Sequence, residues 1–441
     1  MSWKKVKLGD VLIKKNLRFK DVPNLKDPLV LGVTNDKGVV KSKVEAGQKI
    51  DDYYVVNKGD FIYNPYRINV GSIGISELEG ITSLAYVVFN VDETRLNKYL
   101  LFKFLKSDFG IKEIIRNGRG SVRNALKFED LAKIELTIPS LEEQNAFIES
   151  FKQKEIKIDL LKKNYSHQLT LVTQLEQAIL QEAVQGKLVP QDPKDEPASE
   201  LLKRIKAEKA TLRQAQGKGK KEKPLPPIKP EEIPFEIPST WMWCRLGEIC
   251  EVNPRNKVDD ELDAGFISMP MISQVFGVNP TFEVRKWRSI KTGFTHLANN
   301  DVVVAKITPC FENSKAGIIK GLPNGIGAGT TELNVLRGNQ FVLPEYIYAF
   351  VKRVDFLKNG EKIMKGVAGQ QRVPTEYFYN TLIPLPPISE QKRIVAEIEK
   401  QFAKTKQLKE HIITNQQATE QLLKALLHQA FEVEKLEEIN S

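Results

Sequence analysis

The sequence predicts an α+β fold with an internal pseudo-twofold repeat. In this fold, two similar mixed α/β domains are separated by two long helices that pair antiparallel as a coiled coil. Three observations lead to this prediction. Short motifs recur far apart along the chain, two long stretches carry near-heptad apolar stripes, and the segments between them are typical of short strands and turns. With 441 residues, the chain is also too long for one ordinary hydrophobic core.

The repeat is defined by motifs at both ends of each half. WKKVKLGD at 3–10 corresponds to WCRLGE at 243–248, and IPSLEEQ at 138–144 corresponds to LPPISEQ at 385–391. Equivalent positions lie 238 residues apart near the start of the repeat and 247 apart at its end. The variable part therefore lies inside the two globular halves. This suggests two modules that share one architecture and recognise different targets.

The two globular domains are predicted over residues 1–140 and 241–386. In the first, FIYN and VVFNV are typical of strands, and LNKYLLFKFLKSDFGIKEII predicts one helix with a break near Gly110. In the second, DVVVAKI and ELNVL predict strands, and PEYIYAFVKRV predicts a helix. Neither half shows a regular βαβ alternation, so a mixed arrangement is expected.

The long helices are predicted over residues 141–189 and 387–435. In the first, Ser140 and Glu143 form a capping box at its start. Its apolar stripe runs through residues 141, 148, 151, 158, 161, 165, 172, 175 and 179. The stripe of the second helix runs through Val395, Ile398, Phe402, Ile412, Leu422 and Leu426. Such stripes favour a seam between two helices.

Residues 190–240 are predicted to be a basic, proline-rich connector. A short basic helix is expected from Ser199, followed by an extended segment of polyproline character. The net charge of the chain is +10, and residues 201–230 hold ten Lys or Arg and two Glu, which is +8. A surface outside residues 201–230 that binds a polyanion must therefore be a local cluster of basic side chains. The connector itself could touch phosphates or be a solvated linker.

Motifs for cofactors and metals are not found in the sequence. The run at 325–329, GIGAG, lies between strand-like segments with no helix after it, so it favours a backbone turn over a cofactor loop. Cys244, Cys250 and Cys310 match no zinc spacing and suit a reducing compartment. No catalytic residue, metal site or membrane segment is therefore predicted, and a cytoplasmic location is expected.

One short motif raises the question of catalysis. Asn64-Pro65-Tyr66 resembles the Asn-Pro-Pro-Tyr signature of amino-methylating DNA methyltransferases, in which it holds a flipped base. Here the second proline is missing, Arg67 stands where the aromatic residue belongs, and the sister half has Thr308-Pro309-Cys310 instead. The motif therefore favours a strand and turn over a catalytic site.

Loops at matching places in both halves carry side chains suited to DNA. Arg can bond guanine bidentately, and Gln or Asn can do the same to adenine. In the first half the candidate DNA-binding residues are Tyr66, Arg67, Asn69, Arg116, Arg119, Ser121 and Arg123. In the second half they are Lys306, Asn313, Lys315, Lys365, Gln370, Gln371 and Arg372. A solvated loop is the alternative for each, and recurrence in both halves is the argument for DNA.

Taken together, the chain resembles the specificity subunit of type I restriction-modification systems. The resemblance rests on IPSLEEQ at 138–144, IPLPPISEQKRIVAEIE at 383–399, QAILQEAVQGKLVPQDPKDEPASELLKRIKAEKA at 177–210 and IPFEIPSTWMWCRLGEI at 233–249. It implies two target-recognition domains, 1–140 and 241–386, which each read half of a split sequence in double-stranded DNA. The helices over 141–189 and 387–435 would act as the spacer between half-sites.

The same resemblance implies a subunit without catalytic activity. Two methylation subunits would dock on it and supply S-adenosylmethionine, and restriction and motor subunits would bring ATP and Mg²⁺. Two alternatives remain open from the residues alone. One is a catalytic methyltransferase or fused restriction enzyme, favoured by Asn64-Pro65-Tyr66, and the other is a coiled-coil assembly protein without DNA readout.

Overall fold

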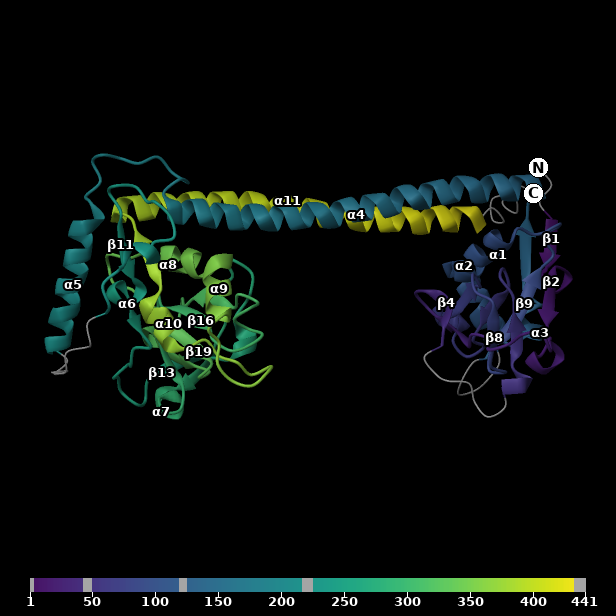
Figure 1. The fold of residues 1–441 in the computed structure, drawn as a ribbon, viewed down its shortest axis with the longest axis horizontal. Helices are drawn as coiled ribbons and strands as arrows, with labels where there is room; N and C mark the ends of the chain where they lie inside the picture. The colour runs from purple at the N-terminus through teal and green to yellow at the C-terminus, as the bar shows by residue number, and fades with distance from the viewer. Residues whose placement is uncertain (1–3, 43–49, 119–124, 216–224, 432–441) are drawn as a thin grey trace. The chain divides into compact units, whose positions relative to one another are not determined.

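The computed structural model describes residues 4–42, 50–118, 125–215 and 225–431. The chain divides into two compact units. Unit 1 contains residues 1–167 and 412–441, and unit 2 contains residues 168–411. Each unit therefore joins one globular half to a segment of each long helix (Figure 1).

Unit 1 is built around a four-stranded antiparallel sheet in the order β2-β9-β6-β7. The ribbons β1–β10, β3–β4 and β5–β8 accompany it. Its strands are β1 Lys4–Lys7, β2 Leu12–Lys15, β3 Leu31–Thr34, β4 Gly38–Lys41, β5 Tyr54–Val56, β6 Phe61–Tyr63, β7 Ile73–Ile75, β8 Gly80–Thr82, β9 Val87–Val91 and β10 Glu135–Ile138. Its helices are α1 Lys98–Lys106, α2 Asp108–Asn117, α3 Phe128–Leu131 and the first part of α4 Leu141–Gln185.

Unit 2 contains two four-stranded sheets, in the orders β12-β19-β16-β17 and β14-β13-β18-β15, and the ribbon β11–β20. Its strands are β11 Met242–Arg245, β12 Glu251–Val252, β13 Asp263–Ile267, β14 Glu283–Lys286, β15 Thr295–Ala298, β16 Val302–Ala305, β17 Ala316–Ile318, β18 Ile326–Gly329, β19 Leu333–Arg337 and β20 Leu382–Leu385. Its helices are α5 Ala198–Ala215, α6 Leu246–Ile249, α7 Trp287–Ile290, α8 Pro344–Val351, α9 Val354–Glu361, α10 Thr375–Asn380 and most of α11 Ile388–Phe431.

The internal repeat is confirmed at the level of topology. The sheet β2-β9-β6-β7 of unit 1 has the same strand order and antiparallel pairing as β12-β19-β16-β17 of unit 2. The ribbon β1–β10 corresponds to β11–β20, and α1 and α2 correspond to α8 and α9. The halves differ in one part. Unit 2 has the sheet β14-β13-β18-β15 there, whereas unit 1 has the short ribbons β3–β4 and β5–β8, and this is where the predicted variable interior lies.

The repeated IPSLEEQ and LPPISEQ motifs attach each long helix to its own globular half. Gln144 is 1% exposed; its Oε1 accepts from the Asn97 N–H (2.8 Å) and its Nε2 donates to the Pro139 carbonyl (2.9 Å). Gln391 is fully buried; its Oε1 accepts from the Leu343 N–H (3.0 Å) and its Nε2 donates to the Pro386 carbonyl (3.1 Å). Both glutamines therefore satisfy backbone groups that would otherwise be buried without partners.

Two predicted helix boundaries are corrected by the structure. The helix of the first half breaks at Ser107, where the Ser107 hydroxyl caps α2 by accepting from the Gly110 N–H (3.0 Å), so the break is not at Gly110. The capping box of Ser140 and Glu143 is confirmed at the start of α4. That helix ends at Gln185 instead of 189, because Gly186 adopts a positive φ of 71°.

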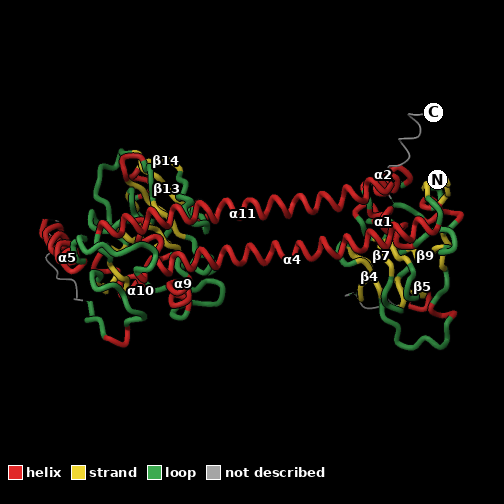
Figure 2. The backbone as a smooth tube through the Cα atoms, turned by 90° about the horizontal axis from the view of Figure 1, so that it is seen from above, coloured by secondary structure: helices red, strands yellow, loops and turns green. Residues whose placement is uncertain are grey.

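The long helices α4 and α11 are antiparallel partners (Figures 1 and 2). In unit 2, Glu176 of α4 accepts from Thr405 Oγ1 (2.9 Å) and from Lys409 Nζ (2.7 Å) of α11. In unit 1, the Tyr165 hydroxyl of α4 lies 3.5 Å from Thr419 Oγ1 of α11. Residue numbers fall along one helix as they rise along the other, which is the antiparallel arrangement predicted.

The apolar stripes were predicted correctly only in part. Ile158 and Val172 of α4 are 4% exposed and Ile412 of α11 is 5% exposed, as expected for a seam. Leu161, Leu175 and Leu422 are instead 41%, 49% and 55% exposed, so their assignment to the seam was wrong. The physical reason is that polar residues, among them Glu176, Thr405 and Lys409, occupy seam positions and bond to one another there.

The connector is partly a packed element of unit 2. Helix α5 begins at Ala198 and buries Ala198, Leu201, Leu202 and Ile205 in the core of this unit. The proline-rich segment after it is held by Arg245, whose guanidinium donates to the carbonyls of Pro226 and Pro227. The short basic helix predicted from Ser199 is confirmed as α5, and the solvated-linker alternative does not hold for residues 198–205 and 226–227. Residues 216–224 lie outside the described part of the chain.

Candidate nucleic-acid interface

In unit 2, two loops that carry candidate residues are joined to each other. The first loop, 306–315, follows strand β16, and the second, 365–372, follows helix α9. The Thr308 N–H donates to the Gln371 carbonyl (3.0 Å), and the Gln371 N–H donates to the Thr308 hydroxyl (3.1 Å). The structure therefore brings Lys306 and the Lys365–Arg372 segment together where the inner strand β16 of the sheet β12-β19-β16-β17 ends.

The segment 365–372 is a short hairpin with an exposed tip. Lys365 and Arg372 exchange both backbone hydrogen bonds (3.0 and 2.8 Å), and the Gln370 N–H donates to the Val367 carbonyl (2.9 Å). Gly369 has a φ of 79°, which a side chain would strain. Val367 is 71% exposed, and Lys365 and Gln370 are also exposed. The tip is thus a rigid projection whose polar side chains face solvent.

Arg372 is held in a structural ion pair. Its Nε and Nη2 donate to both carboxylate oxygens of Glu332 (2.9 and 2.8 Å), and its Nη1 donates to the Gln370 carbonyl (2.8 Å). These hydrogen bonds lower the pKa of Glu332 below its usual value, so the carboxylate stays charged at neutral pH. In this geometry Arg372 positions the hairpin, and Gln370 and Gln371 are the freer side chains.

The loop 306–315 is anchored by a buried lysine, Lys352, which follows helix α8. Lys352 Nζ donates to the Ser314 carbonyl (2.6 Å) and to the Gln274 carbonyl (2.7 Å). Burial lowers the pKa of Lys352 to about 8. Lys315 already makes one hydrogen bond within the protein, from its Nζ to the Met269 carbonyl (3.2 Å). The Asn313 side chain is exposed. Sequence reasoning missed Lys352 and Glu332, since nothing in their local pattern distinguishes them from surface charges.

In unit 1, the corresponding loop follows strand β6. Tyr66 is 58% exposed, Arg67 is exposed, and Asn69 is partly buried. The loop is fixed by the Leu126 N–H, which donates to the Pro65 carbonyl (2.9 Å), and by the Tyr63 hydroxyl, which donates to the Leu126 carbonyl (3.0 Å). As in unit 2, the loop after the third strand of the sheet therefore lies against the segment that follows the second helix.

The remaining candidates of the first half fall at the end of α2. Arg116 lies in its last turn, with its side chain 80% exposed and its guanidinium 3.6 Å from Glu113. Helix α2 packs against the loop residues Ile68–Val70, so Arg116 and the loop with Arg67 belong to one region of unit 1. Arg119, Ser121 and Arg123 lie outside the described residues.

The residues of the suspected catalytic motif serve the local turn. Asn64 Oδ1 accepts from the Tyr66 N–H (3.0 Å), and the Asn64 carbonyl accepts from the Arg67 N–H (3.0 Å). This is a side-chain-capped turn of the kind that Asn commonly forms. The Asn64 side chain is therefore already engaged with its own backbone.

The glycine run at 325–329 forms a strand instead of the predicted turn. Strand β18 is paired with β13 on one side and β15 on the other. A Cβ added at Gly327 would lie 2.4 Å from the Gly265 carbonyl oxygen, so the glycine is needed for close strand packing. The turn interpretation holds only for Gly325 in front of the strand. Within the described ranges, no three His, Cys, Asp or Glu side chains gather in a way that could hold a metal ion.

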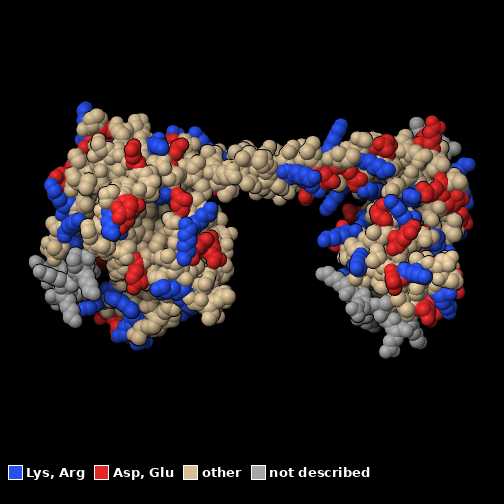
Figure 3. All heavy atoms as spheres, viewed as in Figure 1, with Lys and Arg blue, Asp and Glu red and all other residues tan. Residues whose placement is uncertain are grey.

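Charge is distributed in small patches. On the face seen in Figure 3, basic and acidic side chains are interspersed on both units. At helix α7 and the residue that follows it, for example, Arg288 pairs with Glu261 (2.8 Å) and Lys291 with Asp260 (2.6 Å). No helix in the described part of the chain combines the length and apolar character needed to cross a membrane.

Comparison with known proteins identifies relatives of this chain. A family model for the type I restriction modification DNA specificity domain matches residues 1–171 and 238–416. The specificity subunit of the type I restriction enzyme EcoAI from Escherichia coli is 50% identical over 270 residues, which is 61% of this chain and 46% of that protein. The EcoEI specificity subunit from the same organism is 48% identical over 270 residues, 61% of this chain and 45% of that protein. The chain thus spans about half the length of the curated relatives it matches.

Solved structures share the fold. A chain from a structure of the type I R-M system, which concerns complex assembly and conformational transition, superposes with a TM-score of 0.66 at 16% identity over 98% of both chains. The HsdS subunit from Thermoanaerobacter tengcongensis superposes with a TM-score of 0.58 at 17% identity, over 98% of this chain and 97% of that one. Because the family model covers both globular halves and most of the chain, this protein belongs to the type I restriction modification DNA specificity family.

Proposed function

We propose that this protein is the sequence-specific DNA-binding specificity subunit of a type I restriction-modification complex and reads a bipartite target. The observation that carries the proposal is the match of one specificity-domain family to both halves of the chain. The halves share one sheet topology and differ in their loops and in the second sheet. Such a pair of modules is suited to reading two different half-sites.

In the proposed mechanism, each unit approaches the duplex with the loop that follows strand β6 in unit 1 or strand β16 in unit 2. In unit 2, Gln370 and Gln371 are the side chains for base edges, and Lys306 and Lys365 are those for phosphates. In unit 1, Tyr66, Arg67, Asn69 and Arg116 have these roles. Phosphate contacts set register, and base contacts set sequence.

The long helices are proposed to bind the methylation subunits and to set the distance between half-sites. Apolar side chains on the outer faces of both helices support a docking role, because isolated surface leucines rarely come in such series. On α4 these are Ile156 (62% exposed), Leu160 (58%), Leu171 (48%) and Leu175 (49%). On α11 they are Leu408 (46%) and Ile413 (44%).

We further propose that the chain itself performs no chemistry. Two methylation subunits would supply S-adenosylmethionine and the base-flipping pocket, and restriction and motor subunits would supply ATP hydrolysis and Mg²⁺. The engaged Asn64 side chain and the packed strand β18 support this division. We place the complex in the cytoplasm with its DNA, which is consistent with free Cys244, Cys250 and Cys310.

The test is a selection of DNA sequences by the chain co-purified with its methylation subunit. We expect enrichment of a split motif, and a variant with 365–372 replaced by a Gly-Ser loop should lose one half-site only. Arg116→Ala should act on the other half-site, with Lys154→Ala on α4 as the matched exposed control. Salt-dependent binding without any enriched motif would contradict the proposal, because it would leave only the non-specific term.

A further inference from the structure

An aromatic side chain fills a groove beside the long helix in unit 2. Phe276, from the loop between β13 and β14, stacks on Tyr348 of α8 with 4.8 Å between ring centroids and lies 4.2 Å from the Phe402 ring of α11. The backbone around it is also held. The Gly277 N–H donates to the Tyr348 hydroxyl (3.1 Å), and Lys352 Nζ donates to the Gln274 carbonyl (2.7 Å).

The internal repeat locates the equivalent place in unit 1. The Gln144 and Gln391 clamps align the two long helices, and their bonds to the Asn97 and Leu343 N–H groups align α1 with α8. With these alignments, Phe102 corresponds to Tyr348, Lys106 to Lys352, and Glu155 to Phe402.

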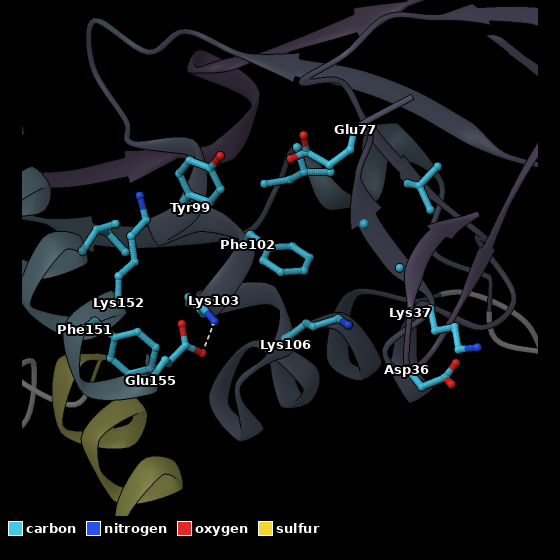
Figure 4. A pocket seen from close by; sticks show the side chains of 15 residues that line it. Asp36, Lys37, Glu77, Tyr99, Phe102, Lys103, Lys106, Phe151, Lys152 and Glu155 are labelled. Atoms are coloured by element: carbon cyan, nitrogen blue, oxygen red, sulfur yellow. Dashed lines mark hydrogen bonds and ion pairs between the residues drawn. The ribbon is translucent and has the colours of Figure 1, made fainter. Parts of the chain in front are cut away.

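In unit 1 this place is an open groove of about 550 Å³, here called the Phe102 groove. It is formed by α1, the start of α4 and the residues 36–39 and 74–77. The Phe102 ring lies at the centre of the lining residues, with Tyr99 and Lys152 on one side and Lys37 on the other (Figure 4). The volume is within the range of ligand-binding clefts and exceeds the space that one side chain needs.

The walls of the groove combine aromatic rings with lysines. Lys152 Nζ lies 4.4 Å from the Tyr99 ring centroid, and Lys106 Nζ lies 5.2 Å from that of Phe102. Lys106 donates to the Asn35 carbonyl (3.2 Å), whereas its counterpart Lys352 donates to two carbonyls. Lys106 therefore has donor capacity left for an oxygen atom of an occupant.

We propose that the Phe102 groove binds a turn segment of a protein partner, like the turn around Phe276 in unit 2, where the Val278 N–H donates to the Val275 carbonyl (3.4 Å). The segment inserts an aromatic side chain against Phe102 and directs carbonyl or carboxylate oxygens to Lys106 and Lys152. The occupant of the equivalent place in unit 2 is itself such a segment, which favours a peptide. The lining holds Lys37, Lys103, Lys106 and Lys152 beside the carboxylates Asp36, Glu77 and Glu155, so charge alone does not select a phosphate group, and a nucleotide is the competing occupant in the test.

This inference stands apart from DNA recognition, so its test needs no DNA. The probe is the capped peptide SQVFGVN, which copies residues 273–279, and binding to the full chain is measured by saturation-transfer NMR of the phenylalanine ring. We expect binding that weakens about 10- to 100-fold when alanine replaces the phenylalanine, as for loss of a buried aromatic ring. Phe102→Ala in the chain should have a similar effect.

Two exposed charge variants control for folding. Lys152→Glu should weaken binding of the peptide at least severalfold, whereas Lys154→Glu, on the same helix but outside the groove, should leave it unchanged. Circular dichroism checks that each variant is folded. The proposal is overturned if both peptides bind alike, if Phe102→Ala and Lys152→Glu bind as the wild type does, or if adenosine monophosphate displaces the peptide at lower concentration than free peptide does.

Discussion

Replacing Gln391 by alanine should detach the start of α11 from the body of unit 2. The substitution removes one acceptor, used by the Leu343 N–H (3.0 Å), and donors to the carbonyls of Pro386 (3.1 Å) and Phe341 (3.3 Å). Because Gln391 is fully buried, water cannot replace these bonds without opening the site. Leaving a buried donor or acceptor unpaired costs about 1–3 kcal/mol each.

Some of this cost is relieved by local adjustment, so we expect Gln391→Ala to lower the stability of unit 2 by about 3 kcal/mol. Gln144→Ala should act in the same way on unit 1, since its bonds to Asn97 and Pro139 are 2.8 and 2.9 Å. Hydrogen exchange with mass spectrometry is the assay. A loss of 3 kcal/mol speeds exchange of the most protected amides of the affected unit by about 150-fold.

The matched control is Gln153→Ala. Gln153 is exposed and bonds only within α4, to Glu149 (3.2 Å), so its removal should change stability by less than about 0.5 kcal/mol. A change this small for Gln391→Ala would refute the reasoning. So would an equal effect of Gln391→Ala on both units, because the clamp is argued to act within one unit.

Three further predictions concern the helix seam, the hairpin and the helix length. Val172→Ala should destabilise the helix pair by about 2 kcal/mol in urea unfolding, while exposed Leu175→Ala should cost less than about 0.5; equal losses would contradict the seam. Glu332→Gln should speed amide exchange in 365–372 at pH 7 and not in acid, because a carboxyl with a lowered pKa stabilises above its unfolded pKa and loses this effect as pH falls through the folded pKa; a pH-independent difference would contradict the ion pair. Deleting seven matched residues from each long helix shortens it by about 10 Å and should shorten the gap of the enriched motif by about three base pairs; an unchanged gap in an assembled complex would exclude the spacer role.

The ends of the repeat were predictable because their motifs act locally. In IPSLEEQ and LPPISEQ, the cap, the proline and the clamping glutamine lie within seven residues of one another, so their pattern survives in the sequence. The antiparallel helix pair was predictable for a similar reason, since buried apolar residues recur two heptads apart on each helix, at Ile158 and Val172 on α4 and at Ile398 and Ile412 on α11. The second sheet of unit 2 was not predictable, because its strands are short and pair across long loops.

The seam and the connector differ from the sequence-based expectation for separate physical reasons. Partly exposed polar residues such as Glu176 and Lys409 pair across the seam, which an apolar pattern cannot reveal, and exposed leucines are then assigned to the seam in their place. In α5, the lysines and arginines give the sequence a solvated appearance, although Ala198, Leu201, Leu202 and Ile205 form the apolar face that packs the helix onto unit 2. The structure brings the loops 306–315 and 365–372 together, but the pairing of Arg372 with Glu332 depends on tertiary contacts that the local sequence does not show.

The central claim is most directly tested by mapping methylated adenines across the host genome with and without this gene. The account predicts a split motif that is methylated when the gene is present and unmethylated when it is deleted. It also predicts that a chain with residues 365–372 replaced changes one half of the motif and keeps the other. A methylation pattern that is unchanged by the deletion would contradict the proposal that this chain selects the DNA target.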